Sequence, residues 1–172
     1  TLANIFASRG IKVALIERQK DFSKEFRGEA LMPSGKEVLD QIGVDLDTEN
    51  IKYRKIDQLN IFYKGALIGN PDIEFIREGQ FRWASQPQLL EKIIEKTSDF
   101  KNFKFFRGFK AEDLIYENDR VSGVRIRNMD EDIFLSGKVV IGFDGRSSMV
   151  RRKLDFSICL LYTSDAADDW SC

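Results

Sequence analysis

Two short apolar runs without a polar break stand out along the chain, at residues 13–16 and 139–141. Unbroken runs of this kind are typical of strands buried on both faces of a mostly parallel sheet, whereas alternating runs indicate half-exposed strands. The first run ends on Glu17, and the second leads into Asp144 and Gly145. Such sheets bind ligands at the carboxyl ends of their strands, so both ends are candidate binding positions.

Three segments carry apolar residues at helical spacing. Their apolar positions are Leu2, Ile5 and Phe6; Val38, Leu39 and Ile42; and Leu89, Leu90, Ile93 and Ile94. Gly10 and Gly43 follow the first two segments and are expected to cap them. Ser34 with Glu37, and Ser85 with Gln88, have the spacing of a capping box, which predicts helix starts at the two serines.

The remaining segments favour short strands. Residues 52–84, including the stretch around Ile73 and Phe75, are expected to form strands with turns at Lys64-Gly65 and Asn70-Pro71. Further strands are predicted at residues 103–106, at 110–116 and 120–127 as a hairpin turning through 117–119, and near 132–135. After Gly145, Ser147 and Ser148 can open a helix.

Composition excludes several classes of function. The 172 residues are 42% hydrophobic and 32% charged, which suits one folded domain or a piece of a larger one. The net charge of -1 gives no electrostatic case for a nucleic-acid partner. No apolar run is long enough for an integral membrane segment, and no signal peptide is visible.

The chain contains no histidine, which removes histidine metal sites, Ser-His-Asp triads and histidine general bases. Its two cysteines, Cys159 and Cys172, provide no disulfide framework or zinc site. A reducing, cytoplasmic location is therefore the default expectation.

A helix, a glycine, a buried strand and a terminal acid form the second half of a dinucleotide-binding βαβ unit, in which the acid accepts hydrogen bonds from a ribose. Glu17 is the candidate for that acid, and the glycine-rich turn is expected about 20 residues earlier, ahead of Thr1. The alternative for Glu17 is a strand that ends in Glu without contacting a ribose. Asp144 can likewise accept from a sugar or ribityl hydroxyl while neighbouring amides face a phosphate. The alternative for Asp144 is an ordinary strand-end Asp-Gly turn.

Taken together, these segments resemble the FAD-dependent aromatic-ring hydroxylases, flavoprotein monooxygenases of the p-hydroxybenzoate hydroxylase type. The resemblance covers about residues 1–156 and rests on four motifs in the family's order. They are Glu17-Arg18, the loop and helix FRGEALMPSGKEVLDQIG at 26–43, the helix opening SQPQLLEKI at 85–93, and GFDGRSSMVRRKL at 142–154.

The resemblance implies an α/β fold. This would be an incomplete FAD-binding, Rossmann-like domain of the glutathione-reductase type, with a mostly parallel sheet, a small antiparallel meander and part of a substrate-side sheet, for which residues 52–84 are the candidates. The family's glycine-rich turn and its later Gly-Asp motif are both missing, so we expect an internal fragment.

The resemblance also implies roles for individual residues. Glu17 would bind the FAD ribose, and Arg18 would lie near the adenine or meet a phosphate of the nicotinamide nucleotide. The implied contacts to flavin, ribityl chain or pyrophosphate come from Arg27, Gly28 and Gln86, and Asp144 and Gly145 would serve FAD and pyridine-nucleotide binding. The implied reaction uses NADPH or NADH and O2 to hydroxylate a small organic, aromatic substrate. No side chain is assigned as catalytic nucleophile or base, because the cofactor carries the chemistry.

Two alternatives stay open from the sequence. Another flavoprotein on the same fold, such as a halogenase or a prenyl-lipid reductase, would share these motifs. The alternative of another class is a non-enzymatic nucleotide-binding or interaction module, which would be favoured if the parent gene lacked the glycine-rich turn upstream and the Gly-Asp motif downstream.

Residues 157–172 form a separate segment, SICLLYTSDAADDWSC, that contains both cysteines and no Lys or Arg. It resembles translated sequencing-adapter sequence, so we expect a non-native tail after residue 156 with little native packing. Resequencing the parent locus tests this expectation.

Overall fold

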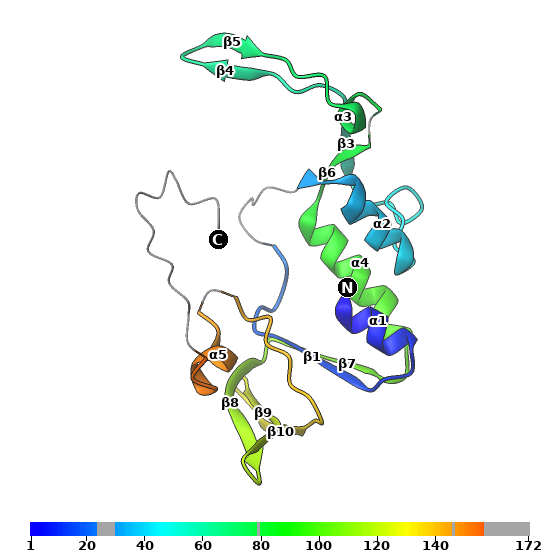
Figure 1. Cartoon of the computed structure of the whole chain (residues 1–172). Coiled ribbons are helices and arrows are strands. Elements are labelled where there is room, and N and C mark those ends of the chain that lie inside the picture. The colour runs from blue at the N-terminus through cyan, green and yellow to red at the C-terminus, as the bar shows by residue number, and fades with distance from the viewer. Residues whose placement is uncertain (24–29, 79, 146, 157–172) are drawn as a thin grey trace. The chain divides into compact units, whose positions relative to one another are not determined.

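The computed structural model describes residues 1–23, 30–78, 80–145 and 147–156. The chain divides into two compact units, Thr1–Gly108 and Phe109–Cys172, whose helices and strands are labelled in Figure 1. None of the helices in the described ranges combines the length and the apolar character that crossing a bilayer requires.

Unit 1 is built on one parallel strand pair and the helices that precede its two strands. The elements are α1 (Leu2–Ser8), β1 (Val13–Glu17), α4 (Gln86–Ser98) and β7 (Phe103–Arg107). β1 and β7 pair in parallel from Val13 opposite Phe103 to Glu17 opposite Arg107. This confirms the predicted parallel strand that ends on Glu17. The strand is half-buried rather than fully buried, because β7 is its one hydrogen-bonded neighbour in the described sheet.

Glycine ends α1 and α2 (Pro33–Gln41) as predicted. Gly43 has a φ of +73°, and its N–H donates to the carbonyl of Asp40 at 3.0 Å. The next amide, Val44, donates to the carbonyl of Leu39 at 2.9 Å. This pair of bonds is the Schellman motif, and α1 ends with the same pair around Gly10, whose φ is +79°.

The helix starts differ in part from the capping-box prediction. The N-cap of α2 is Met32, two residues before Ser34, so the helix begins at Pro33 and Ser34 lies inside its first turn. Proline is pre-organised for this position because its φ is already helical. Ser85 is the N-cap of α4, but no capping box forms. The Gln88 side chain accepts from the Lys52 amide at 2.8 Å and so joins α4 to the preceding segment.

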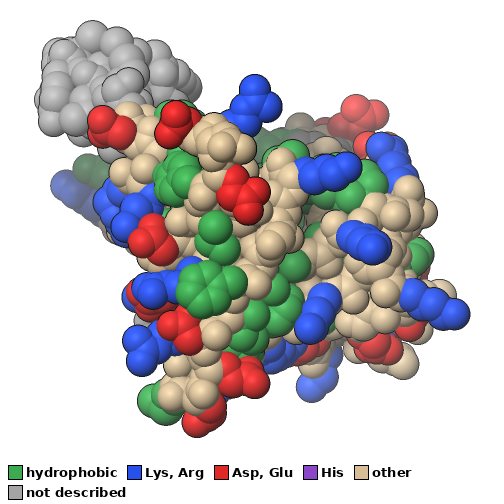
Figure 2. All heavy atoms as spheres, turned by 90° about the horizontal axis from the view of Figure 1, so that it is seen from below, with side chains coloured by type: hydrophobic (Ala, Val, Ile, Leu, Met, Phe, Trp, Pro, Cys, Tyr) green, Lys and Arg blue, Asp and Glu red, His purple; other side chains and the backbone are tan. Residues whose placement is uncertain are grey.

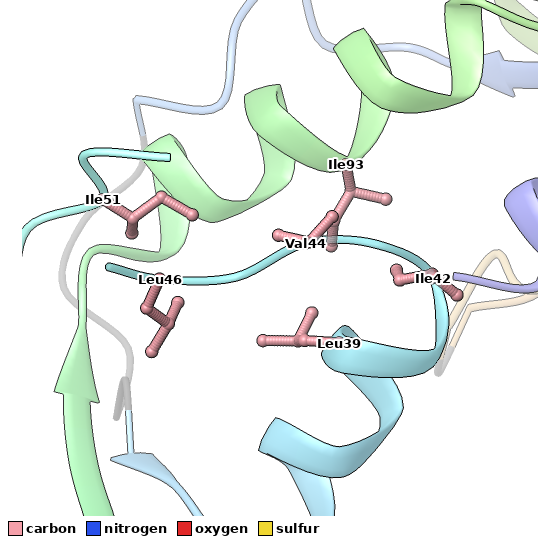
Figure 3. Close-up of a cluster of buried hydrophobic side chains, with 6 residues drawn as sticks. All are labelled: Leu39, Ile42, Val44, Leu46, Ile51 and Ile93. Carbon is pink, nitrogen blue, oxygen red and sulfur yellow. The ribbon is translucent and has the colours of Figure 1, made fainter. Parts of the chain in front are cut away.

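The core of unit 1 lies between α2, the loop that follows it, and α4. Its buried side chains are Leu39, Ile42, Val44, Leu46, Ile51 and Ile93, drawn in Figure 3. In that view Ile93 projects from α4 toward Val44, while Leu39 projects from the end of α2. The predicted apolar face of α2 is confirmed for Leu39 and Ile42, whereas Val38 is 39% exposed.

Residues 52–84 form the predicted short strands with one exception. The strands are β3 (Tyr53–Ile56), β4 (Ile61–Tyr63), β5 (Ala66–Gly69) and β6 (Phe81–Ala84). In one sheet β6 pairs antiparallel with β3 and with β2 (Ala30–Leu31), and in another β4 pairs antiparallel with β5. The expected strand around Ile73 and Phe75 is wrong, because a helical turn, α3 (Glu74–Arg77), occupies that position. The amides of Ile76 and Arg77 donate to the carbonyl of Ile73, and this turn buries Ile76.

Unit 2 is an antiparallel meander followed by a short helix. Its elements are β8 (Lys110–Glu117), β9 (Arg120–Arg127), β10 (Asp132–Ser136) and α5 (Met149–Lys153), with strand order β10-β9-β8 and α5 against β8. Asn118 and Asp119 both have positive φ, as a two-residue type I′ hairpin turn requires. The predicted meander is confirmed, and Ile126 at its centre is fully buried.

The predicted buried strand at residues 139–141 is wrong. This segment forms no strand, and Val139, Ile141 and Phe143 are 74%, 50% and 81% exposed. An apolar, β-branched run forms a strand only where another strand satisfies its backbone groups, and none of the described strands pairs with it. The apolar character of the segment is therefore not matched by burial in this structure.

Candidate functional site

Glu17 ends β1 with its carboxylate held in a defined position. Its Oε1 accepts from the Gln19 amide at 2.8 Å, and its own carbonyl accepts from the Gly108 amide at 2.7 Å. The residue is half-buried, and no hydrogen bond to Oε2 forms within the described part of the chain. The carboxylate therefore has one oxygen committed to the backbone and one that can accept from a ligand hydroxyl.

Arg107 lies opposite Glu17 at the end of β7 and binds Glu91 on α4. Its two terminal nitrogens donate to the two Glu91 oxygens at 2.7 and 2.6 Å. The guanidinium also lies 4.8 Å from the ring centre of Phe22 and 5.1 Å from that of Phe105. Hydrogen bonding between the partners raises the pKa of Arg107 and lowers the pKa of Glu91, so both stay charged across the physiological range.

The other residues predicted for this half of the site are less fixed. Arg18 is exposed directly after Glu17. Gln86 is half-buried at the first position of α4. Arg27 and Gly28 lie outside the described residues. Sequence reasoning did not single out Gln19, whose side-chain Oε1 is buried and has no hydrogen-bond partner in the described ranges.

Asp144 binds the first turn of α5. Its carboxylate accepts from the Ser148 hydroxyl and from the amides of Met149 and Val150, at 2.5 and 3.2 Å for the amides. Ser148, the N-cap, accepts from the Arg151 amide at 3.0 Å. Partial burial raises the pKa of Asp144, but these hydrogen bonds outweigh it, so the pKa lies below its ordinary value.

This helix contact is a role that sequence reasoning did not assign to Asp144. The spacing of Asp144 ahead of Ser148 was available as a capping signal, because carboxylates are favoured at helix N-termini. Gly145 next to it has a φ of +77°, so its conformation favours glycine. Gly142 was also not singled out. A Cβ there would lie 2.8 Å from the Cβ of Val150, so the chain passes close to α5 at this point.

The chemistry of these positions suits a polar organic ligand. They offer carboxylate, amide and hydroxyl groups, and the described residues contain no cluster of three or more metal-binding side chains. On the face seen in Figure 2, acidic and basic side chains are interspersed, in keeping with the net charge of -1. Glu17 belongs to unit 1 and Asp144 to unit 2.

A family model described as an FAD binding domain matches residues 1–163. Among curated proteins, the chain is 29% identical over 154 residues to 6-methylpretetramide 4-monooxygenase of Streptomyces rimosus. That match covers 88% of this chain and 37% of the relative. The chain therefore spans a little over a third of the length of this curated relative.

Two solved structures share the fold. PqsL of Pseudomonas aeruginosa in complex with 2-aminobenzoylacetate has a TM-score of 0.75 at 20% identity, covering 91% of this chain and 43% of that one. The p-nitrophenol 4-monooxygenase PnpA of Pseudomonas putida DLL-E4 has a TM-score of 0.71 at 21% identity, covering 88% of this chain and 39% of that one. These similarities confirm the predicted α/β fold class.

Proposed function

This chain belongs to the FAD binding domain family, and from that premise we propose that it is part of an FAD-dependent monooxygenase that hydroxylates a small aromatic compound. The match of the FAD binding domain model to residues 1–163 confirms the family resemblance predicted from the four motifs. Two of the similar proteins are named monooxygenases, and a third has 2-aminobenzoylacetate bound, which supports the reaction class and an aromatic substrate. NADPH or NADH and O2 are the proposed co-substrates.

The observation that carries the proposal is the position of Glu17. It stands at the carboxyl end of a parallel strand, where ligands of such sheets bind. Its Oε1 is held by the Gln19 amide, which leaves Oε2 to accept from a donor. The adenosine ribose of FAD has hydroxyl groups that can donate hydrogen bonds, and the free Oε2 of Glu17 can accept one. The residues here fit the cofactor.

When bound, FAD would supply the redox chemistry that hydroxylation with a nicotinamide nucleotide and O2 requires. The protein residues are proposed to bind and orient. Glu17 accepts from the ribose, and Gln86 donates or accepts near the ribityl chain or pyrophosphate with its amide. Arg18 meets the adenine or a phosphate of the nicotinamide nucleotide, and Arg27 with Gly28 approaches the flavin. Asp144 and Gly145 stay predicted as cofactor contacts.

The binding part of the proposal is tested by replacing Glu17 with Gln in the full-length protein that contains this chain. Charge-assisted hydrogen bonds contribute about 1.5–3 kcal/mol each, so FAD affinity should fall by at least about tenfold. Glu37→Gln, at an exposed position on α2, is the matched control and should bind FAD as the unchanged protein does. Unchanged FAD affinity in Glu17→Gln would contradict the assigned role.

The reaction class has its own test. The full-length protein should consume NADPH or NADH together with O2 and release a hydroxylated aromatic product. A halogenase would require halide and release a halogenated product, a prenyl-lipid reductase would saturate its substrate without adding oxygen, and a nucleotide-binding module would turn over neither co-substrate. Any of these results would replace the proposed reaction.

A further inference from the structure

Glu17 and Arg107 are opposite charges in register at the ends of paired strands. Strands in a sheet lie about 4.8 Å apart, and residues in register project to the same face. An arginine in this position is within reach of the carboxylate beside it. Unless another acid holds it, the guanidinium would form the two-point ion pair that arginine makes with carboxylates.

The structure contains that other acid. Glu91 projects from α4 and accepts from both terminal nitrogens of Arg107 at 2.7 and 2.6 Å. The ion pair that Arg107 forms is with Glu91, and the attraction between Arg107 and Glu17 acts only at longer range. The rings of Phe22 and Phe105 lie against the guanidinium and help to hold it in this orientation.

From this arrangement we infer that Glu91 is a positioning residue, which keeps Arg107 bound and thereby keeps the Glu17 carboxylate available to ribose hydroxyls. The inference rests on the proposed role of Glu17. A carboxylate oxygen that accepts from arginine has fewer acceptor sites and less negative charge to offer a hydroxyl, so affinity for the hydroxyl falls. Neither Glu91 nor Arg107 needs to touch the ligand for this effect.

Asp21 is the other acid close enough to influence Arg107. Both the amide of Ser23, at 2.9 Å, and its hydroxyl donate to one oxygen of Asp21, Oδ1, so Asp21, like Glu17, has one oxygen committed within its own loop. Glu17 has one oxygen committed and lies directly in register with Arg107. If Glu91 is neutralised, Arg107 can therefore turn to Glu17 or to Asp21, and the loss of hydroxyl preference measured below reports the share that turns to Glu17.

The test measures how strongly the full-length protein prefers a ligand with ribose hydroxyls. ADP and 2′,3′-dideoxy-ADP are each used to compete with FAD, and the ratio of their dissociation constants gives the hydroxyl preference. The ratio reports the Glu17 interaction itself, because a general loss of structure weakens both nucleotides alike. It requires no turnover by the enzyme.

The expected pattern has four parts. Glu91→Gln should reduce the hydroxyl preference about three- to fivefold, the size of an exposed ion pair. The double variant Glu91→Gln with Arg107→Gln should regain the original preference, because the competing cation is gone. Arg107→Gln alone should keep it. Glu95→Gln, on the same helix but paired with Lys92, is the matched control and should also keep it.

Two results would overturn the inference while leaving the role of Glu17 intact. One is an unchanged preference in Glu91→Gln when Glu17→Gln abolishes it. The other is a double variant as impaired as Glu91→Gln. If instead the unchanged protein shows no hydroxyl preference, or Glu17→Gln retains it, the proposed function of Glu17 is wrong and the inference falls with it. Thermal unfolding of each variant identifies any that fails to fold, and Glu91→Ala then replaces Glu91→Gln.

Discussion

The side-chain amide of Asn4 donates a hydrogen bond to the hydroxyl of Thr97 across 3.2 Å, with the two residues 4% and 1% exposed. Thr97 in turn donates to the carbonyl of Ile93, one turn earlier in α4, at 2.6 Å. Asn4 belongs to α1, so this bond connects the helices that precede β1 and β7. It therefore fixes the two helices beside the strands that end on Glu17 and Arg107.

Replacing Thr97 with Val should destabilise unit 1 by about 1–3 kcal/mol, because the buried Asn4 amide loses its acceptor. Thr97→Ser keeps the hydroxyl and is the matched control, with a smaller loss from the missing methyl group. Urea unfolding followed by circular dichroism measures both variants. A Val variant at least as stable as the Ser variant would mean that the hydrogen bond contributes nothing.

Gly123 in β9 should not tolerate a side chain. A Cβ at this position would lie 2.2 Å from the carbonyl oxygen of Leu135 in β10, which is closer than two non-bonded atoms can approach. Gly123→Ala must therefore push β10 away, at a cost of about 1–3 kcal/mol as for other overpacked sites. Gly69→Ala, in β5, is the matched control, since its nearest neighbour would be Ile61 at an ordinary 3.8 Å.

Thermal unfolding and amide hydrogen exchange measure the effect. Exchange should quicken at the amides that pair β9 with β10 in Gly123→Ala, while Gly69→Ala should leave the meander as protected as before. Equal protection in both variants would contradict the predicted clash.

Asp144→Ala should loosen the first turn of α5, because the carboxylate accepts from the amides of Met149 and Val150. Loss of a helix-capping acceptor costs about 0.5–2 kcal/mol. Hydrogen exchange at these two amides measures the local effect. Asp130→Ala, at an exposed turn between β9 and β10, is the control and should leave α5 unchanged.

The stability that Asp144 contributes should also depend on pH, and Asp144→Ala tests this. The pKa of Asp144 is lower in the folded protein than its ordinary value of 3.8, since hydrogen bonds from Ser148 and the helix amides outweigh partial burial. Its contribution to stability is therefore fully present above pH 3.8 and is lost as the pH falls through the lowered folded value. The stability difference between the unchanged protein and Asp144→Ala should shrink in that acidic range. A difference that grows there would contradict the capping role.

The sequence by itself determined the elements that depend on neighbouring residues. The spacing of Leu39 and Ile42 with Gly43 after them specified the buried face and the end of α2, because helical period and left-handed φ are local properties. The hairpin at Asn118-Asp119 followed from turn residues between two alternating segments. The four motifs, from Glu17-Arg18 to the segment at 142–154, together identified the family, because each is short and their order along the chain can be read from the sequence.

Only the tertiary structure decided what depends on a partner distant in sequence. The apolar run at 139–141 has the composition of a buried strand, yet it stays exposed because no described strand pairs with it. The acceptor that binds Arg107 is Glu91, sixteen residues away on another element, and no local pattern pairs them. Charge and hydrogen-bond partners are set by distance in space, so the environment of Glu17 could be described only once β1, α4 and β7 were placed together.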